Sequence, residues 1–99
     1  MERLLHHRVR LGLVSALAVS GSMAFAELKR ALGLTDGNLS AHARKLEEAG
    51  MVSCTKRFSG RTPRTTYRLT DVGRSAFERY LQHMESLIDA TKSAREESS

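Results

Sequence analysis

Two short amphipathic segments that follow each other closely constrain the fold of this 99-residue chain more than any other feature. In GSMAFAELKRALGL, the side chains of Phe25, Leu28 and Leu32 fall on one stripe at helical spacing. Ser22 is the expected N-cap of this helix, and Gly33 is the expected left-handed residue that ends it. A second helical segment, TDGNLSAHARKLEEAG, starts directly afterwards. Two short helices joined by a tight turn that contains glycine form a helix-turn-helix.

The second of these helices separates an apolar face from a polar one. Thr35 is its expected N-cap, Asp36 sits favourably in its first turn, and Gly50 closes it. With about 100° of rotation per residue, the inward face consists of Leu39, Ala43, Leu46 and Gly50. The outward face is small, polar and lightly basic, and consists of Gly37, Ala41, Arg44 and Glu48, flanked by Asn38, Ser40 and Lys45.

A basic β-hairpin is predicted to follow. The segments MVSCTKRF and TTYRL alternate and are rich in β-forming residues. The expected one-face sets are Val52, Cys54 and Phe58 in the first strand, and Thr65, Tyr67 and Leu69 in the second. The stretch SGRTPR is expected to form the tip. No acidic residue occurs between Glu48 and Asp71, whereas a solvated loop normally mixes its charges.

Longer helical patterns enclose these elements. RLLHHRVRLGLVSALAVS, residues 3–20, has an apolar stripe wider than one packed face needs. After Thr70, the expected N-cap of the last helix, apolar residues recur at helical spacing as far as Ile88. We therefore expect a mainly α protein with a small β-hairpin, in the order α-α-α-β-β-α. Residues 1–92 would form a single domain, and residues 93–99 a frayed polar tail.

The stretch LGLTDGNLSAHARKLEEAGMVSCTKRFSGRTPRTTYRLTDVGRSAF resembles the small winged-helix regulators related to the MarR and ArsR groups. The resemblance extends over about residues 4–90 and rests on FAELKRALGLTDGNLS, LEEAGMV and RTPRTTYRLTDVGRSAF. It implies that the second helix of the motif enters the major groove of double-stranded DNA and that the hairpin, or wing, reaches an adjacent minor groove. It also implies dimers formed through the first and last helices. Ala43 departs from the family pattern, which often has leucine there.

These features predict a sequence-specific DNA-binding transcriptional regulator that acts as a repressor. Arginine and asparagine make bidentate contacts to guanine and adenine, and a narrow minor groove attracts an inserted arginine. Arg61 or Arg64, on either side of Pro63, is expected to enter the minor groove. Thr35, at a helix N-terminus, is well placed to bind phosphate. The candidate DNA-binding residues are Thr35, Asn38, Ser40, Ala41, Arg44 and Lys45 on the helix, and Lys56, Arg57, Arg61, Arg64 and Arg68 on the wing.

A homodimer is expected because one small core cannot use both long apolar stripes. The candidate dimerisation residues are Leu4, Leu5, Leu11, Tyr80, Leu81, Met84, Leu87 and Ile88. An unknown small-molecule effector remains a possible partner, and it would have to bind between the dimerisation helices and the helix-turn-helix.

Other chemistry has little support in the residues. The sequence contains no nucleophile elbow, glycine-rich phosphate loop, paired carboxylate motif or metal-ligand set, so we expect neither an enzyme nor a cofactor. A metal site remains an alternative if His6, His7 and His83 meet at a dimer interface. Cys54 is expected in the core, and His42 is expected to be a packed or phosphate-touching residue.

Composition favours a polyanionic partner, because sixteen Lys and Arg against eleven Asp and Glu give a net charge of +5. A single cysteine suits a reducing compartment, and charged residues interrupt the apolar N-terminal stretch before it is long enough to span a bilayer. We therefore expect a cytoplasmic protein without a membrane partner. A winged helix that binds RNA or a protein is the alternative, but the first would not favour a palindromic duplex and the second would not need an acid-free wing.

Overall fold

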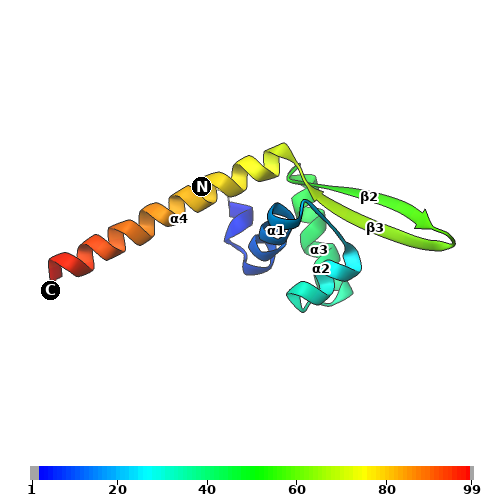
Figure 1. Ribbon diagram of the computed structural model, residues 1–99, viewed down its shortest axis with the longest axis horizontal. Helices are drawn as coiled ribbons and strands as arrows, with labels where there is room; N and C mark the ends of the chain where they lie inside the picture. Colours follow the sequence, from blue (N-terminus) through cyan, green and yellow to red (C-terminus); the bar gives the residue numbers. More distant parts are fainter. Residues whose placement is uncertain (1–2, 99) are drawn as a thin grey trace.

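The computed structural model describes residues 3–98 and is mainly helical, with one three-stranded antiparallel sheet. This confirms the expected fold class. The elements in chain order are the 3-10 helix η1 (Arg3–His6), α1 (Arg8–Ser20), β1 (Ser22–Ala24), α2 (Phe25–Leu32), α3 (Asp36–Glu48), β2 (Val52–Ser59), β3 (Thr62–Leu69) and α4 (Asp71–Ser98). Figure 1 shows the wing and α4 extending in opposite directions from a small helical body, which makes the molecule 63 Å long and 25 Å wide.

The core lies around α1, which contacts α2, α3, β3 and α4. Its fully buried side chains come from every helix of the body: Leu5, Leu13, Val14, Leu17, Leu28, Leu39, Ala43, Leu46 and Ala76. Met51, Val52, Tyr67 and Leu69 close the core where the hairpin leaves it. This arrangement fixes the helix-turn-helix, α2 and α3, and the base of the wing relative to each other.

The third strand, β1, was not predicted. Met23 lies opposite Tyr67 of β3, in the order β1-β3-β2. Ser22, expected to cap the next helix, belongs to this strand, and the N-cap of α2 is Ala24. The Glu27 carboxylate accepts from the Ala24 N–H at 3.0 Å, which is the return hydrogen bond of a capping box, while alanine supplies no side-chain cap to the first turn. A three-residue strand shows no alternation of its own, so its partner strand defines it.

The N-terminal helix is interrupted, although the sequence pattern predicts one helix over residues 3–20. His7 adopts an extended backbone and caps α1, its Nδ1 accepting from the Val9 N–H at 3.2 Å. The preceding turn is the 3-10 helix η1. Arg10 ties the two together, because its Nε donates to the Leu4 carbonyl oxygen at 2.8 Å. A histidine side chain that competes for the backbone N–H explains the break.

Two predicted caps of the helix-turn-helix, Gly33 and Thr35, are confirmed. Gly33 has φ 64° at the end of α2, and Thr35 Oγ1 accepts from the Asn38 N–H at 3.1 Å. Gly50, with φ 75°, ends the α3 turn, but it is exposed and does not extend the inward face as expected. The buried residues of that face are Leu39, Ala43 and Leu46.

The start of α4 is locked against the end of α3. The Thr70 hydroxyl accepts from the Gly73 N–H at 3.0 Å, as its predicted capping role requires, and donates to the Gly50 carbonyl oxygen at 2.6 Å. Gly73 is buried so tightly that a Cβ on it would overlap the Met51 carbonyl oxygen. These contacts join the start of α4 to the turn that follows α3.

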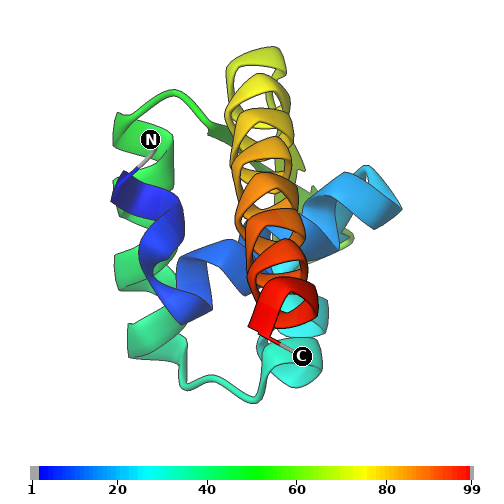
Figure 2. The same ribbon diagram turned by 90° about the vertical axis from the view of Figure 1, so that its left-hand side faces the viewer.

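The distal half of α4 leaves the body. Every described side chain from Glu85 to Glu97 is exposed, and Figure 2, viewed along the helix, shows it in front of the other elements. The helix continues to Ser98, through the residues expected to form a frayed tail. Whether these last turns fray in solution stays a prediction.

Candidate nucleic-acid interface

The outer face of α3, by which we mean the five residues predicted to read DNA, is accessible throughout. Its members Asn38, Ser40, Ala41, Arg44 and Lys45 are all exposed. Glu47 and Glu48 follow them at the C-terminal end of the helix. Arg44 and Lys45 lie in the second half of α3, so only Asn38, Ser40 and Ala41 belong to the N-terminal turns, which are the part of a recognition helix that contacts base edges.

The wing is more regular than the sequence suggested. Its strands pair from Val52–Leu69 to Ser59–Thr62, so only Gly60 and Arg61 form the turn. The expected tip SGRTPR is too long, because Thr62, Pro63 and Arg64 belong to β3. Gly60 has φ 66°, which a two-residue hairpin turn requires at a central position. Pro63 is tolerated within β3 because β1 pairs with β3 only at residues 66–68. The edge of β3 opposite β2 is therefore unpaired at Pro63.

Alternation along the strands divides the basic residues of the wing between two faces. Lys56 lies on the same face as Cys54 and Tyr67, which is the face toward α3. Arg57 and Arg64 are cross-strand partners on the opposite face, where Arg68 also lies, opposite Ser53. These three arginines line a hollow of about 410 Å³ with Thr55, Phe58, Ser59 and Thr66. The structure thus brings Lys56 toward the outer face of α3, whereas Arg57, Arg64 and Arg68 lie on the face of the wing that points away from it.

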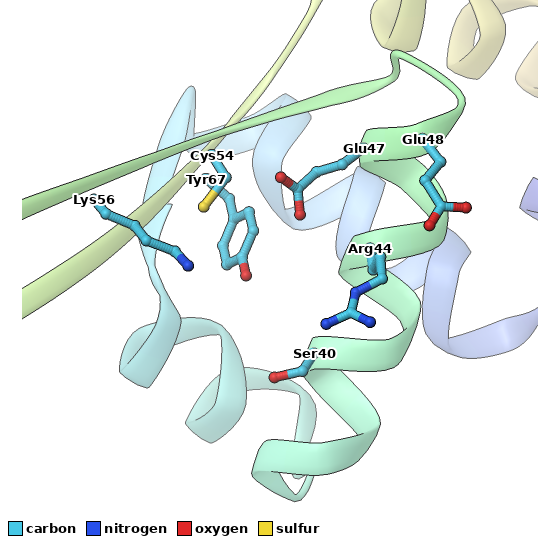
Figure 3. A pocket seen from close by; sticks show the side chains of 7 residues that line it. All are labelled: Ser40, Arg44, Glu47, Glu48, Cys54, Lys56 and Tyr67. Carbon is cyan, nitrogen blue, oxygen red and sulfur yellow. The ribbon is translucent and has the colours of Figure 1, made fainter.

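A larger pocket of about 490 Å³ lies between α3 and the wing. Figure 3 shows its lining: Ser40, Arg44, Glu47, Glu48, Cys54, Lys56 and Tyr67. Sequence reasoning missed it, because it assigned Cys54 to the core and gave no role to Tyr67. Cys54 is half-buried. It packs against the core, as expected, and it also borders this open space.

The two polar groups at the base of this pocket are neutral at physiological pH. Burial raises the pKa of Tyr67 to about 12, with further contributions from Cys54 and Glu47. Burial, followed by the Glu47 carboxylate, raises the pKa of Cys54, while Lys56 and a hydrogen bond with Tyr67 act in the opposite direction. The pocket base therefore adds no negative charge beside Arg44 and Lys56.

Comparison with known proteins identifies this architecture. Residues 9–88 match the family model of the winged helix DNA-binding domain. The chain belongs to that family. It is a DNA-binding domain of the kind found in transcriptional regulators, and the family assignment confirms that it is not an enzyme.

Among solved structures, a transcriptional regulator homologue from Pyrococcus horikoshii OT3 superposes with a TM-score of 0.86 at 34% identity, covering 91% of this chain and 89% of that one. An uncharacterized protein from Methanocaldococcus jannaschii is 44% identical over 57 residues, which are 58% of this chain and 62% of that relative. The fold is also similar to PadR from Bacillus subtilis, solved in complex with operator DNA, with a TM-score of 0.68 and 14% identity over 76% of this chain and 47% of PadR.

The residues predicted to form a dimer occupy three different environments. Leu5 and Tyr80 belong to the protomer's own core. Leu5 has no exposed surface left for a partner, so the expectation for it is corrected, whereas Tyr80 is 9% exposed and its dimer role stays a prediction. Leu4, Leu11 and Met84 are partly buried against that core. The remaining members, Leu81, Leu87 and Ile88, are exposed on α4.

Two further observations bear on alternative partners. Within residues 3–98, no three His, Cys, Asp or Glu side chains come together as metal ligands would. In the same range no helix is both long and apolar enough to cross a bilayer.

Proposed function

We propose that the protein is a homodimeric transcriptional repressor that binds a specific double-stranded DNA site. In this proposal α3 occupies the major groove and the wing contacts phosphates and an adjacent minor groove. The observation that carries it is the exposed outer face of α3, placed beside a wing with five positive side chains. Along residues 3–98, no carboxylate forms an ion pair with any of those five.

The roles of the individual residues follow from their chemistry. Arg44 and Asn38 are the proposed base readers, because their side chains make bidentate contacts to guanine and adenine. Thr35 and Lys45 would contact phosphates beside them. Arg61, at the wing turn, is the proposed minor-groove residue, since the turn is the part of the wing that reaches farthest from the body (Figure 1).

Repression fits a module of this kind, because occupancy of DNA alone excludes other proteins from the site. The operator complex of PadR supports the proposal that a fold of this type docks on duplex DNA. Selection of genomic fragments with the purified protein identifies the site. Transcription in vitro from a template that carries this site should then fall as the protein is added, and increased transcription would contradict the repressor assignment.

The first test of the wing is the salt dependence of duplex binding. Each phosphate neutralised contributes about 0.9 to the slope of log K against log salt. Arg61→Ala/Arg64→Ala should therefore lower the slope by about one to two per protomer and weaken specific and random duplexes by similar factors. Lys92→Ala is the matched control, since it removes a positive charge from the exposed distal part of α4, outside the proposed interface, and should leave the slope unchanged. An unchanged slope in the folded double variant would remove the wing from the mechanism.

The second test concerns the outer face of α3. Arg44→Ala and Asn38→Ala should reduce specific binding far more than random binding, because base contacts specify while phosphate contacts position. The expected loss is about 1–3 kcal/mol for each bidentate contact. If both variants keep the wild-type ratio of specific to random affinity, another surface reads the sequence. Preferential binding to single-stranded RNA would favour the alternative of an RNA-binding winged helix.

A further inference from the structure

A compact group of cationic and imidazole side chains lies where α1 begins alongside α3. The imidazole rings of His7 and His42 have their centroids 4.3 Å apart. The guanidinium Nη1 of Arg10 lies 3.4 Å from His42 Nδ1. Lys45 follows His42 by about one turn of α3 and is close enough to act on its charge. We refer to His7, Arg10, His42 and Lys45 as the flank cluster.

The flank cluster and the wing lie on opposite sides of the outer face of α3. At about 100° per residue, His42 and Lys45 point to one side of the helix, and Ser40 and Glu47 to the other. Ser40 and Glu47 line the pocket beside the wing, whereas His42 contacts α1. Figure 2 shows η1 and the start of α1 next to α3. A duplex lying on the outer face would therefore meet basic groups on both flanks.

Among residues 3–98, no carboxylate acts on the charge of His42. The groups that act on His42 are His7 at the N-cap of α1, Arg10 within α1 and Lys45 on α3 itself. Each of them lowers the pKa of His42, in addition to the larger effect of burial. Of the nearby groups on η1, the Leu4 carbonyl holds Arg10, and the His6 ring packs instead on Tyr80 of α4. The first turn of α1 contains no acidic residue, so its N-terminal partial positive charge adds to the cluster.

We propose that the flank cluster is a second DNA-backbone site, which binds a phosphodiester and takes up a proton on His42 as it does so. The proposal rests on the proposed function and adds a contact on the side of α3 opposite the wing. It also predicts a pH dependence that the wing arginines cannot produce, because arginine keeps its charge throughout the physiological range.

The proton balance follows from the geometry. A hydrogen bond from Arg10 to His42 Nδ1 requires that this nitrogen be unprotonated, so the free protein holds His42 neutral, with its proton on Nε2. A phosphodiester placed in the cluster brings one negative charge, which offsets the repulsion that Arg10 and Lys45 exert on a protonated His42. His42 then accepts a proton from solvent at Nδ1, and the Arg10 guanidinium is released to the phosphate. Binding consumes protons, so affinity should rise as the pH falls.

The test is duplex affinity as a function of pH, measured by fluorescence anisotropy between pH 5.5 and 8 at constant ionic strength. In the wild-type protein log K should rise on acidification, with a slope of up to about one proton per protomer. His42→Gln keeps a polar side chain of similar size but cannot take up a proton, so its profile should be nearly flat. His83→Gln, an exposed histidine on α4, is the matched control and should follow the wild type.

Imidazole NMR resonances separate the possible anions. Duplex DNA should raise the pKa of His42, whereas inorganic phosphate at millimolar concentration should leave it unchanged. An equal response to inorganic phosphate would overturn the proposal in favour of a free-anion site. A wild-type pH profile in the folded His42→Gln variant would also overturn it, while the wing-dependent salt slope would keep the proposed function intact. Absence of duplex binding at every pH would reject both.

Discussion

Arg57 of β2 and Arg64 of β3 are direct cross-strand partners, so two guanidinium groups emerge side by side on the face of the wing that points away from α3. Like charges that lie directly opposite in an antiparallel pair destabilise it. The free wing therefore holds repulsion that an anion would relieve. Under the proposed function, a phosphate of the DNA backbone would be that anion.

Arg64→Glu should separate stability from binding. It turns the repulsive pair into an attractive one, so the free energy of unfolding should rise by about 0.2–1 kcal/mol in urea denaturation. Duplex affinity should fall at the same time, because the arginine is replaced by a negative charge. In Arg57→Glu/Arg64→Glu the pair is repulsive again, so the stability gain should disappear while binding stays weak. Equal stability of the wild type and Arg64→Glu would show that the two side chains avoid each other in solution.

Alanine substitutions at two separate glycines, Gly73 and Gly37, test the packing that connects α3 to α4. Gly73→Ala would drive a methyl group into the backbone of Met51, so it should destabilise the protein by about 1–3 kcal/mol. Gly37, in the first turn of α3, has open space around it. Gly37→Ala should therefore stabilise the free protein by up to about 1 kcal/mol, since alanine favours helices. Chemical denaturation of both variants checks the contrast, and a neutral Gly73→Ala would mean that the α4 junction is loose.

Thiol labelling reports on the pocket between α3 and the wing. Because the pKa of Cys54 is raised by burial and by Glu47, little thiolate is present at pH 7.5 and a disulfide reagent should react slowly. Glu47→Gln removes the negative charge, lowers the pKa and should accelerate the reaction. In the wild-type protein, saturating duplex should slow the labelling of Cys54 below the rate of the free protein, since Ser40 and Arg44 line the same pocket.

The control for this protection is an exposed cysteine far from α3. Cys54→Ser/Ser93→Cys places the only thiol on the distal part of α4, where duplex should not change the labelling rate. Equal protection of both thiols would indicate aggregation on DNA, and protection of neither would place the duplex away from this pocket.

Most of the helix-turn-helix could be predicted from sequence because its determinants are local. Thr35, Gly33 and Thr70 act as caps or stops on residues within a few positions of themselves, and Leu39, Ala43 and Leu46 share a face through helical periodicity alone. The faces of the two wing strands were predicted for the same reason, since alternation defines them, and only the extent of the turn was wrong.

The features that were missed depend on contacts between distant segments. Strand β1 exists through its pairing with β3, more than 40 residues later, as in the pair Met23–Tyr67. The break at His7 and the contact between Arg10 and His42 depend on how α1 packs on α3. Leu5 looked available for a dimer interface because a wide apolar stripe does not indicate which of its residues the protomer buries itself.

The distal half of α4 yields the last prediction, that the protein is a homodimer at micromolar concentration. Leu87 and Ile88 are 48% and 50% exposed on a helix that lies beyond the rest of the described chain. Isolated helices of this length are marginal in water, so a second copy that buries the same stripe would stabilise it. Leu81 and Met84 continue that stripe toward the body.

Leu87→Glu should dissociate the dimer, because it would bury an unpaired charge in the interface. Light scattering should give a dimer mass for the wild type and a monomer mass for the variant. Val19→Glu is the matched control, since Val19 is 90% exposed at the end of α1 and lies outside the stripe, so this variant should remain dimeric. The Leu87→Glu monomer should keep its α2–α3 fold and its salt-dependent binding to random duplex, while losing the added affinity of two half-sites held at a fixed spacing. A wild type that scatters as a monomer across this range would leave the α4 stripe without a partner copy and remove the basis for palindromic binding.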